Sequence, residues 1–235
     1  MKHTNEHGRS MVEMLGVLAI IGVLSVGGIA GYSKAMNKFK VNKTMDQVSS
    51  IIANIRTMFS SQKGYQGLTA ERAVKLGVVP SDMGYEGEEE FSILYNAFGG
   101  YVVIQASDLV SSGDDKAFAV AYTGLTQEAC VTLATGDWGS NEASGLVAIK
   151  TGCIQEGDPE GAITEVYNID NIYLNDTGNK IKANSPIAQP GNKNSPTPMQ
   201  VSKAVAGCSG NSDDDKHSGD GCGEEEKPYV VWKYY

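Results

Sequence analysis

The sequence contains one uncharged apolar run of twenty residues, from Met14 to Ser33. A helix of that length extends about 30 Å, which is the thickness of the hydrocarbon core of a bilayer. The run lies directly between Glu13 and Lys34, so its limits are sharply marked by charge. Apolar surface on this scale is driven out of water, and the segment must be covered by lipid or by other apolar chains.

The helical pattern continues beyond the apolar run. Between Val41 and Phe59, apolar residues recur at steps of one, three or four, as on one face of an amphipathic helix: Val41, Met45, Val48, Ile51, Ile52, Ile55, Met58 and Phe59. The first proline of the chain is Pro80, so nothing breaks the helix earlier. We predict one helix from near Ser10 to Ser61, apolar in its first half and amphipathic in its second.

A cleaved secretory signal peptide is the alternative interpretation of the first thirty residues. Lys2 and Arg9 provide a basic start, and Gly28-Ile29-Ala30 matches a small-x-small cleavage site. The apolar run is longer than the roughly 7 to 15 residues usual in such peptides, and the helical pattern passes through the site. A retained helix is therefore favoured.

Charge is distributed unevenly along the chain. The 235 residues carry 19 Lys and Arg against 28 Asp and Glu, a net charge of −9. Residues 9–63 sum to +5 and residues 64–235 to −14. An acidic body lacks the cationic face that a nucleic-acid binder needs, so we expect no nucleic-acid partner.

The sequence offers no residue set for catalysis. Of three His residues, only His217 lies in the body of the chain, and there is neither a Walker A loop nor a GxGxxG motif. The four Cys residues are too widely spaced for CxxC chemistry and indicate disulfides formed in an oxidising compartment. We expect no enzyme activity, no cofactor and no metal centre.

The pattern of strands and short helices in residues 64–235 predicts an α+β fold, in which the long helix covers one face of a mainly antiparallel sheet. EGEEE at residues 86–90 is expected to be a charged break, and the final strand is expected to bury one face. The expected strands are Phe91–Tyr95, Tyr101–Ala106, Ala117–Tyr122, Leu146–Thr151, Val166–Leu174 and Tyr229–Tyr235, and the expected short helices are Ala70–Leu76, Thr126–Thr135 and Thr197–Ala206.

The segment Gly8-Arg9-Ser10-Met11-Val12-Glu13, preceded by a short polar leader, resembles the type IV prepilin signal. The resemblance implies that a prepilin peptidase cuts after Gly8, that the new amine on Arg9 is methylated, and that Glu13 becomes the fifth mature residue. Arg9 departs from the apolar first residue usual in the family. Glu13 would be neutralised by the α-amino group of Arg9 in an adjacent subunit, which joins charge burial to docking.

A second stretch resembles the type IVb pilins: the run Lys116 to Cys130 (KAFAVAYTGLTQEAC), with Val147 to Lys150 and Asn96 to Gly100. The resemblance implies a leader at 1–8, a transmembrane and filament-core helix at 9–61 and a head at 62–235. It also implies an inner-membrane prepilin, an inner-membrane assembly platform and a homo-oligomeric filament on the cell surface. The alternatives within this class are a minor pilin and a secretion-system pseudopilin.

The positions of the lysines disagree with the membrane orientation that this resemblance implies. A pilin needs its leader in the cytoplasm, yet the lysines after the apolar run outnumber Lys2 and Arg9: Lys34, Lys38, Lys40 and Lys43. Positive charge counting alone favours the opposite insertion.

Four Cys residues allow three pairings. In type IVb pilins a Cys on the helix after the GLTQ-like turn bonds to a Cys shortly before the last strand. The resemblance implies Cys130 as the first of these and Cys208 or Cys222 as the second. Cys130 with Cys208 is favoured because both are expected on or beside short helices as in the family, which leaves Cys153 with Cys222. The local pairs, Cys130 with Cys153 and Cys208 with Cys222, are the alternative. The acidic segment 211–226 is expected to be a solvated loop, with Ca²⁺ binding as the alternative.

Overall fold

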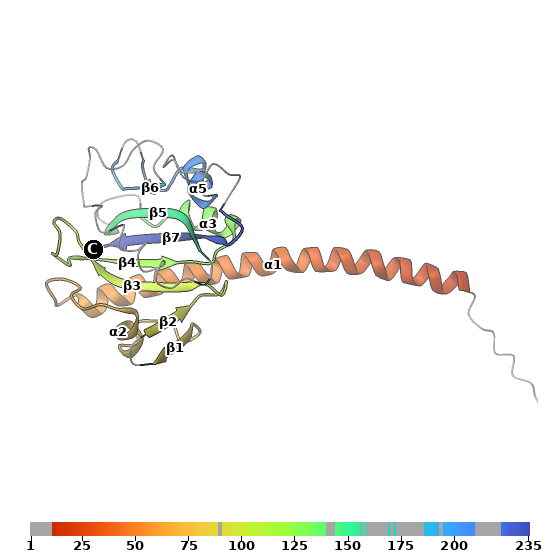
Figure 1. Cartoon of the computed structure of the whole chain (residues 1–235), viewed down its shortest axis with the longest axis horizontal. Helices are drawn as coiled ribbons and strands as arrows, with labels where there is room; N and C mark the ends of the chain where they lie inside the picture. Colours follow the sequence, from red (N-terminus) through yellow and green to blue (C-terminus); the bar gives the residue numbers. More distant parts are fainter. Residues whose placement is uncertain are drawn as a thin grey trace, which may run out of the picture. The chain divides into compact units, whose positions relative to one another are not determined.

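The computed structural model describes residues 11–88, 91–139, 144–155, 157, 169, 172, 186–192, 195–209 and 222–235. The chain divides into two compact units, residues 1–40 and 41–235, and the boundary between them falls inside the first helix. Figure 1 labels the helices and strands. The predicted leader at 1–8, with Gly8 and Arg9, lies outside the described residues.

Helix α1 runs without interruption over Met11–Phe59, which confirms the single long helix predicted from the pattern. From Val41 onward one side of it is buried and the other exposed. The buried residues are Val41, Thr44, Gln47, Val48, Ile51, Ile52, Ile55 and Phe59. This stripe belongs to the main hydrophobic core of the second unit, together with side chains of the sheet.

The described strands form one seven-stranded sheet in the order β1-β2-β3-β4-β7-β5-β6. Every neighbouring pair is antiparallel, as the sequence predicts. The strands are β1 (Gly84–Glu88), β2 (Phe91–Tyr95), β3 (Tyr101–Ser107), β4 (Ala117–Tyr122), β5 (Leu146–Gln155), β6 (Ile187–Ala188) and β7 (Glu226–Tyr234). With α1 this is the predicted α+β fold, and the last of the described strands, β7, lies inside the sheet between β4 and β5.

The two faces of the sheet are built from alternating side chains. In β4, Phe118, Val120 and Tyr122 join the core that includes α1, while Ala119 and Ala121 face a second hydrophobic cluster. A period of two places neighbouring residues on opposite faces, which accounts for this division.

The expectation that the last strand buries only one face is wrong. In β7 every residue from Pro228 to Tyr234 is buried. Strands β4 and β5 cover the two edges of β7. Its two faces are covered because one hydrophobic core lies on each side of the sheet. Even Lys233 is fully buried, and its Nζ donates to the carbonyl oxygens of Ile169 and Ile172 at 3.1 and 3.0 Å.

The charged break expected at residues 86–90 is also wrong for its described part. Residues 86–88 continue β1, which pairs with β2 from Gly84 opposite Tyr95 to Glu88 opposite Phe91. Hairpin pairing satisfies the backbone there, and an edge strand tolerates charged side chains because one edge faces solvent. The strand expected at Val166–Leu174 lies outside the described residues, apart from Ile169 and Ile172.

The three short helices form close to their predicted positions. They are α2 (Ala70–Lys75), α3 (Gln127–Ala134) and α5 (Val201–Cys208). Thr126 caps α3 by accepting a hydrogen bond from the backbone N–H of Ala129. Helix α5 begins four residues later than predicted, at Val201 instead of Thr197, and Pro198 lies between these two positions.

Gly207 brings α5 close to β5. A Cβ at this position would lie 2.0 Å from Oγ1 of Thr151 and 2.9 Å from Cβ of Pro186, and the residue is buried. We predict that Gly207→Ala lowers the free energy of unfolding by about 1 to 3 kcal/mol through overpacking. The measurement is chemical denaturation of the full chain in detergent, followed by circular dichroism.

Gly223→Ala is the matched control, because its added Cβ would meet its nearest atoms at 3.5 Å, an ordinary contact distance. Equal stability of the Gly207→Ala variant and the control would contradict the close packing of α5 on β5.

Candidate assembly surface

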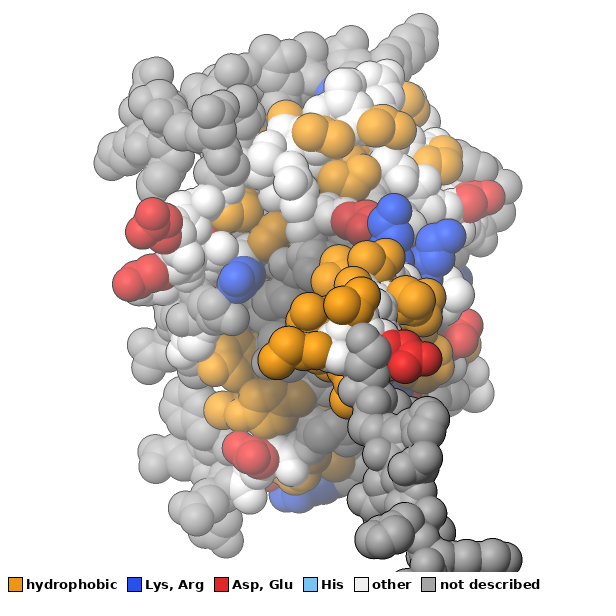
Figure 2. Space-filling view, turned by 90° about the vertical axis from the view of Figure 1, so that its right-hand side faces the viewer, with side chains coloured by type: hydrophobic (Ala, Val, Ile, Leu, Met, Phe, Trp, Pro, Cys, Tyr) orange, Lys and Arg blue, Asp and Glu red, His pale blue; other side chains and the backbone are white. Residues whose placement is uncertain are grey.

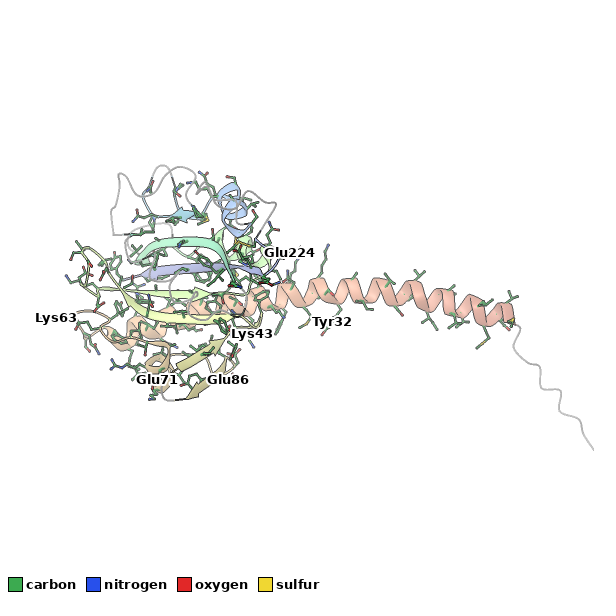
Figure 3. All side chains as sticks on the ribbon, in the orientation of Figure 1. Tyr32, Lys43, Lys63, Glu71, Glu86 and Glu224 are labelled. Atoms are coloured by element: carbon green, nitrogen blue, oxygen red, sulfur yellow. A yellow bond between two sulfur atoms is a disulfide. The ribbon has the colours of Figure 1, made fainter. Side chains whose placement is uncertain are left out.

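The first half of α1 presents apolar side chains on every side. Its large hydrophobic residues from Met11 to Tyr32 are each 47–83% exposed. They are Met11, Val12, Met14, Leu15, Val17, Leu18, Ile20, Ile21, Val23, Leu24, Val26, Ile29 and Tyr32. Figure 3 shows these side chains projecting around the helix, and in Figure 2 hydrophobic side chains gather at the helix end facing the viewer.

We call the residues from Met11 to Ser33 the apolar segment. By length and composition α1 can cross a membrane, and none of its most apolar stretch is buried within the chain. A helix that is apolar all round is stable when lipid or other helices surround it. The apolar segment is therefore a surface that the rest of the chain leaves uncovered.

Glu13 lies in the first turn of α1, with its side chain exposed. The backbone N–H groups of a first turn lack partners within the helix and carry partial positive charge, which favours a carboxylate there. In the sequence Glu13 directly precedes Met14, where the uncharged run begins. The two residues predicted to act with it, Gly8 and Arg9, are not among the described residues.

Polar contacts fasten the second half of α1 to the rest of its unit. Lys43 Nζ lies 2.9 Å from Oδ2 of Asp82, and Nε2 of Gln47 donates to the same oxygen at 3.3 Å. Further along, Asn54 donates to the carbonyl oxygen of Val78 at 2.9 Å. Asp82 could not be predicted as a partner from the sequence, because the pair joins residues far apart in the chain.

The Asp82 carboxylate responds to this contact. The hydrogen bond from Lys43 holds the pKa of Asp82 below its ordinary value, against the opposing effect of desolvation. Half of the Asp82 side chain is exposed. The stabilisation is therefore that of a surface ion pair, about 1 kcal/mol or less.

Two disulfides close the second unit. Cys130 of α3 bonds to Cys208 of α5, with 5.9 Å between their Cα atoms, and both residues are buried. Cys153 of β5 bonds to Cys222 before β7, with 5.7 Å between their Cα atoms, and both are half-buried. These are the pairs that the resemblance implied, in place of the local alternative. A disulfide of this kind contributes about 2 to 4 kcal/mol.

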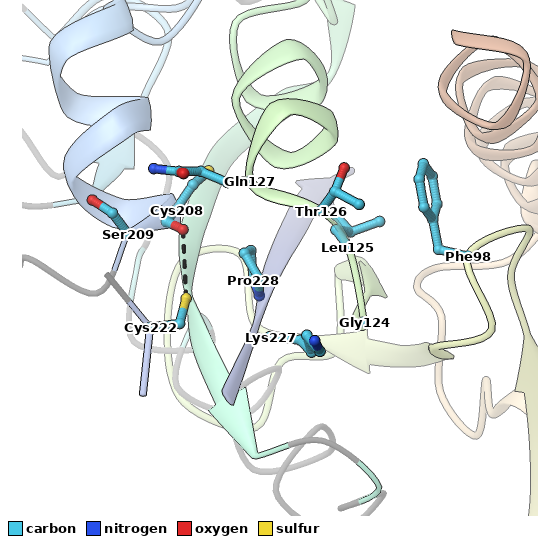
Figure 4. Close-up of a pocket in the computed structure, with 10 residues that line it drawn as sticks. All are labelled: Phe98, Gly124, Leu125, Thr126, Gln127, Cys208, Ser209, Cys222, Lys227 and Pro228. Carbon is cyan, nitrogen blue, oxygen red and sulfur yellow. Dashed lines mark hydrogen bonds between the residues drawn. The ribbon is translucent and has the colours of Figure 1, made fainter. Parts of the chain in front are cut away.

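A shallow cavity of about 470 Å³ lies beside these bonds. Figure 4 shows its lining residues: Phe98, Gly124, Leu125, Thr126, Gln127, Cys208, Ser209, Cys222, Lys227 and Pro228. Among these, Lys227 brings a charge, and the set contains neither a carboxylate nor an imidazole. Such a lining lacks an acid-base pair for catalysis.

The acidic segment 211–226 can be followed only from Cys222 onward. Glu224 and Glu225 are exposed there. Within the described ranges, no group of three His, Cys, Asp or Glu residues could hold a metal ion. Residues 211–221, on which the Ca²⁺ alternative depends, lie outside those ranges.

The family described as "PilS N terminal" matches residues 33–167, which is more than half of the chain. Toxin coregulated pilin of Vibrio cholerae serotype O1 is 28% identical over 135 residues, which are 57% of this chain and 59% of that protein. The major structural subunit of bundle-forming pilus from Escherichia coli O127:H6 is 26% identical over 143 residues, 60% of this chain and 70% of that protein.

Solved structures of pilins also align with the chain. The crystal structure of TcpA, a type IV pilin from Vibrio cholerae El Tor biotype, has 20% identity and a TM-score of 0.48, covering 83% of this chain and 99% of that one. The crystal structure of the type IVb pilin from Salmonella typhi has 16% identity and a TM-score of 0.45, covering 79% and 93%.

The chain combines an apolar N-terminal helix with a disulfide-bonded antiparallel head, and its sequence is similar to those of pilins. The chain belongs to the family described as PilS N terminal. The match to two toxin coregulated pilin sequences spans 59% and 65% of their lengths, less than two thirds.

The ion pair between Lys43 and Asp82 predicts a pH dependence. Because the folded pKa of Asp82 is depressed below 3.8, its contribution is complete above that pH and is lost as pH falls through the folded value. The difference in free energy of unfolding between the wild type and Asp82→Asn should be about 1 kcal/mol or less at pH 6 and shrink toward zero below pH 3.8. Urea denaturation across this range measures it.

Asp46→Asn is the control, since Asp46 is also an exposed aspartate and lies on α1. A wild-type advantage over Asp82→Asn that stays constant as the pH falls below 3.8 would contradict the assigned ion pair.

Proposed function

We propose that this chain is a structural subunit of a type IVb-like pilus. It is held in the bacterial inner membrane as a prepilin, cut after Gly8 by a prepilin peptidase, and passed through an inner-membrane assembly platform into a homo-oligomeric filament on the cell surface. In this proposal residues 1–8 are the leader, 9–61 the membrane and filament-core helix, and 62–235 the head.

The observation that carries the proposal is the uncovered apolar segment of α1. Burial of apolar surface contributes about 25 cal/mol per Å², so a helix exposed on all sides is a large source of association energy. Lipid covers it before assembly, and equivalent helices of other copies cover it afterwards. Repetition of one such contact along an open helix produces a filament.

Glu13 supplies the specificity of docking in this proposal. A carboxylate that enters an apolar helix bundle costs a few kcal/mol unless a cation neutralises it. The α-amino group of Arg9 on an adjacent subunit provides that cation after cleavage. Correct register between helices then coincides with neutralisation, and wrong registers leave the charge unpaired.

Continuity of α1 argues against a secreted protein that discards its first thirty residues. The helix passes through Gly28-Ile29-Ala30 without a break and continues into the stripe that begins at Val41. A cut at this point would open the mature chain in the middle of a helix. A body subunit is preferred over a minor pilin or a pseudopilin because Glu13 is present.

Substitution of Glu13 tests the proposed function. Glu13→Ala and Glu13→Gln should both lower the amount of filament sheared from cells by at least about tenfold, because a loss of only about 1.4 kcal/mol per docking step already has that effect. Immunoblots of the sheared fraction measure it, and the membrane fraction shows that the subunit is still inserted.

Glu224→Gln is the matched control, since it removes an exposed carboxylate from the head. Wild-type amounts of filament from both Glu13 variants would refute the proposed role of the carboxylate.

A further inference from the structure

Two lysines and an aromatic residue mark the end of the apolar segment. Lys34 and Lys38 are exposed and lie four residues apart, which places them on the same side of α1. Tyr32, labelled in Figure 3, is 67% exposed and lies two residues before Lys34. We call Tyr32, Lys34 and Lys38 the lysine band.

No carboxylate on α1 offsets these charges. Between Glu13 and Asp46 the sequence of the helix contains no acidic residue. Among the ion pairs of the described residues, Lys43 and Lys75 take part, while Lys34 and Lys38 do not. The band is thus a local concentration of positive charge on the compact unit formed by residues 1–40.

The length of the apolar run fixes the depth of the band in a membrane. Met14 to Ser33 extends about 30 Å and fills the hydrocarbon core, so Lys34 emerges at the level of the headgroups. Tyrosine prefers this interface, and lysine stems extend along apolar surface to bring their amines to it. Both residue types occur here in the expected order.

The same lysines pose a problem for orientation. Positive residues favour the cytoplasmic side, whereas the proposed pilin has the band on the outer side of the inner membrane. A favourable contact with negative charge on that side offsets this preference. Phospholipid phosphates are the anions present at that depth along the whole membrane surface.

We propose that the lysine band binds the phosphate groups of anionic phospholipids and so holds the unassembled subunit at a fixed depth in the bilayer. This inference rests on the proposed function, since it requires the apolar segment to be retained in a membrane. On leaving the membrane, the subunit exchanges these lipid contacts for contacts with other copies.

Lipid quenching of a reporter in the band tests the proposal. The full chain carrying Tyr32→Trp is reconstituted in phosphatidylcholine vesicles with 20 mol% phosphatidylglycerol, and the emission of the parent chain is subtracted to remove Trp138 and Trp232. Bromine is placed on the acyl chains of one lipid or the other at equal mole fraction. The ratio of the two quenching efficiencies reports lipid enrichment around the reporter.

We expect quenching by brominated phosphatidylglycerol to exceed quenching by brominated phosphatidylcholine about threefold, since each lysine attracts anionic lipid. Lys34→Gln with Lys38→Gln should return the ratio to about 1, and so should about 1 M salt, which screens the attraction. The control is Lys63→Gln with Lys75→Gln, which removes equal charge from two exposed lysines of the second unit and should keep the threefold ratio.

Three outcomes overturn the proposal. Equal quenching by both lipids in the reporter chain shows that the band selects no anionic lipid. Equal quenching together with loss of filaments in the Lys34 and Lys38 variant assigns the lysines to contacts between copies. Absence of quenching by either lipid places the segment outside the bilayer, and this result alone also refutes the proposed function.

Discussion

Apolar surface that runs all the way round a helix cannot remain in water, and the rest of this molecule is arranged around that constraint. From Met11 to Ser33 the helix α1 has no face that its own chain covers. Lipid or further copies must therefore complete the structure. The second half of the same helix, in contrast, is buried in the larger of two hydrophobic cores, which it shares with side chains of the sheet. One continuous helix thus serves two environments.

The sheet and its two disulfides stabilise the unit that contains the second half of α1. The last described strand of the sequence, β7, lies inside the sheet between β4 and β5, so this sheet is complete only when the C-terminal residues are in place. The two disulfides join α3 to α5 and β5 to the residues before β7. The two bonds join residues 78 and 69 positions apart in the sequence, and closing such long loops restricts the unfolded chain. Disulfides of this kind form and persist in an oxidising compartment.

Periodicity was enough to predict the long helix, most of the strands and the α+β class. Each of those elements has a strong local pattern, such as Ala117 to Tyr122 in β4. The errors concern features that depend on distant parts of the chain. Pairing with β2 makes a strand of the acidic residues 86–88, and the two hydrophobic clusters on opposite sides of the sheet bury both faces of β7. Lys233 shows this most clearly, because a buried lysine has no sequence signal of its own.

The parts of the candidate site differ in whether the sequence alone can predict them. The apolar segment could be predicted because its composition alone defines it, whereas the pairing of Lys43 with Asp82 required the fold. The role of Glu13 came from the resemblance to the prepilin signal and stays a prediction. The structure also shows where the unevenly distributed charges lie. Exposed lysines follow directly after the apolar segment, and exposed acids lie on the head.

N-terminal sequencing of subunits purified from sheared surface filaments tests most directly that the apolar helix is kept and its leader removed. The account predicts Arg9 as the first residue, with Glu13 fifth. A mature chain that begins at Gly31 would contradict it, since the segment that builds the filament would then have been discarded.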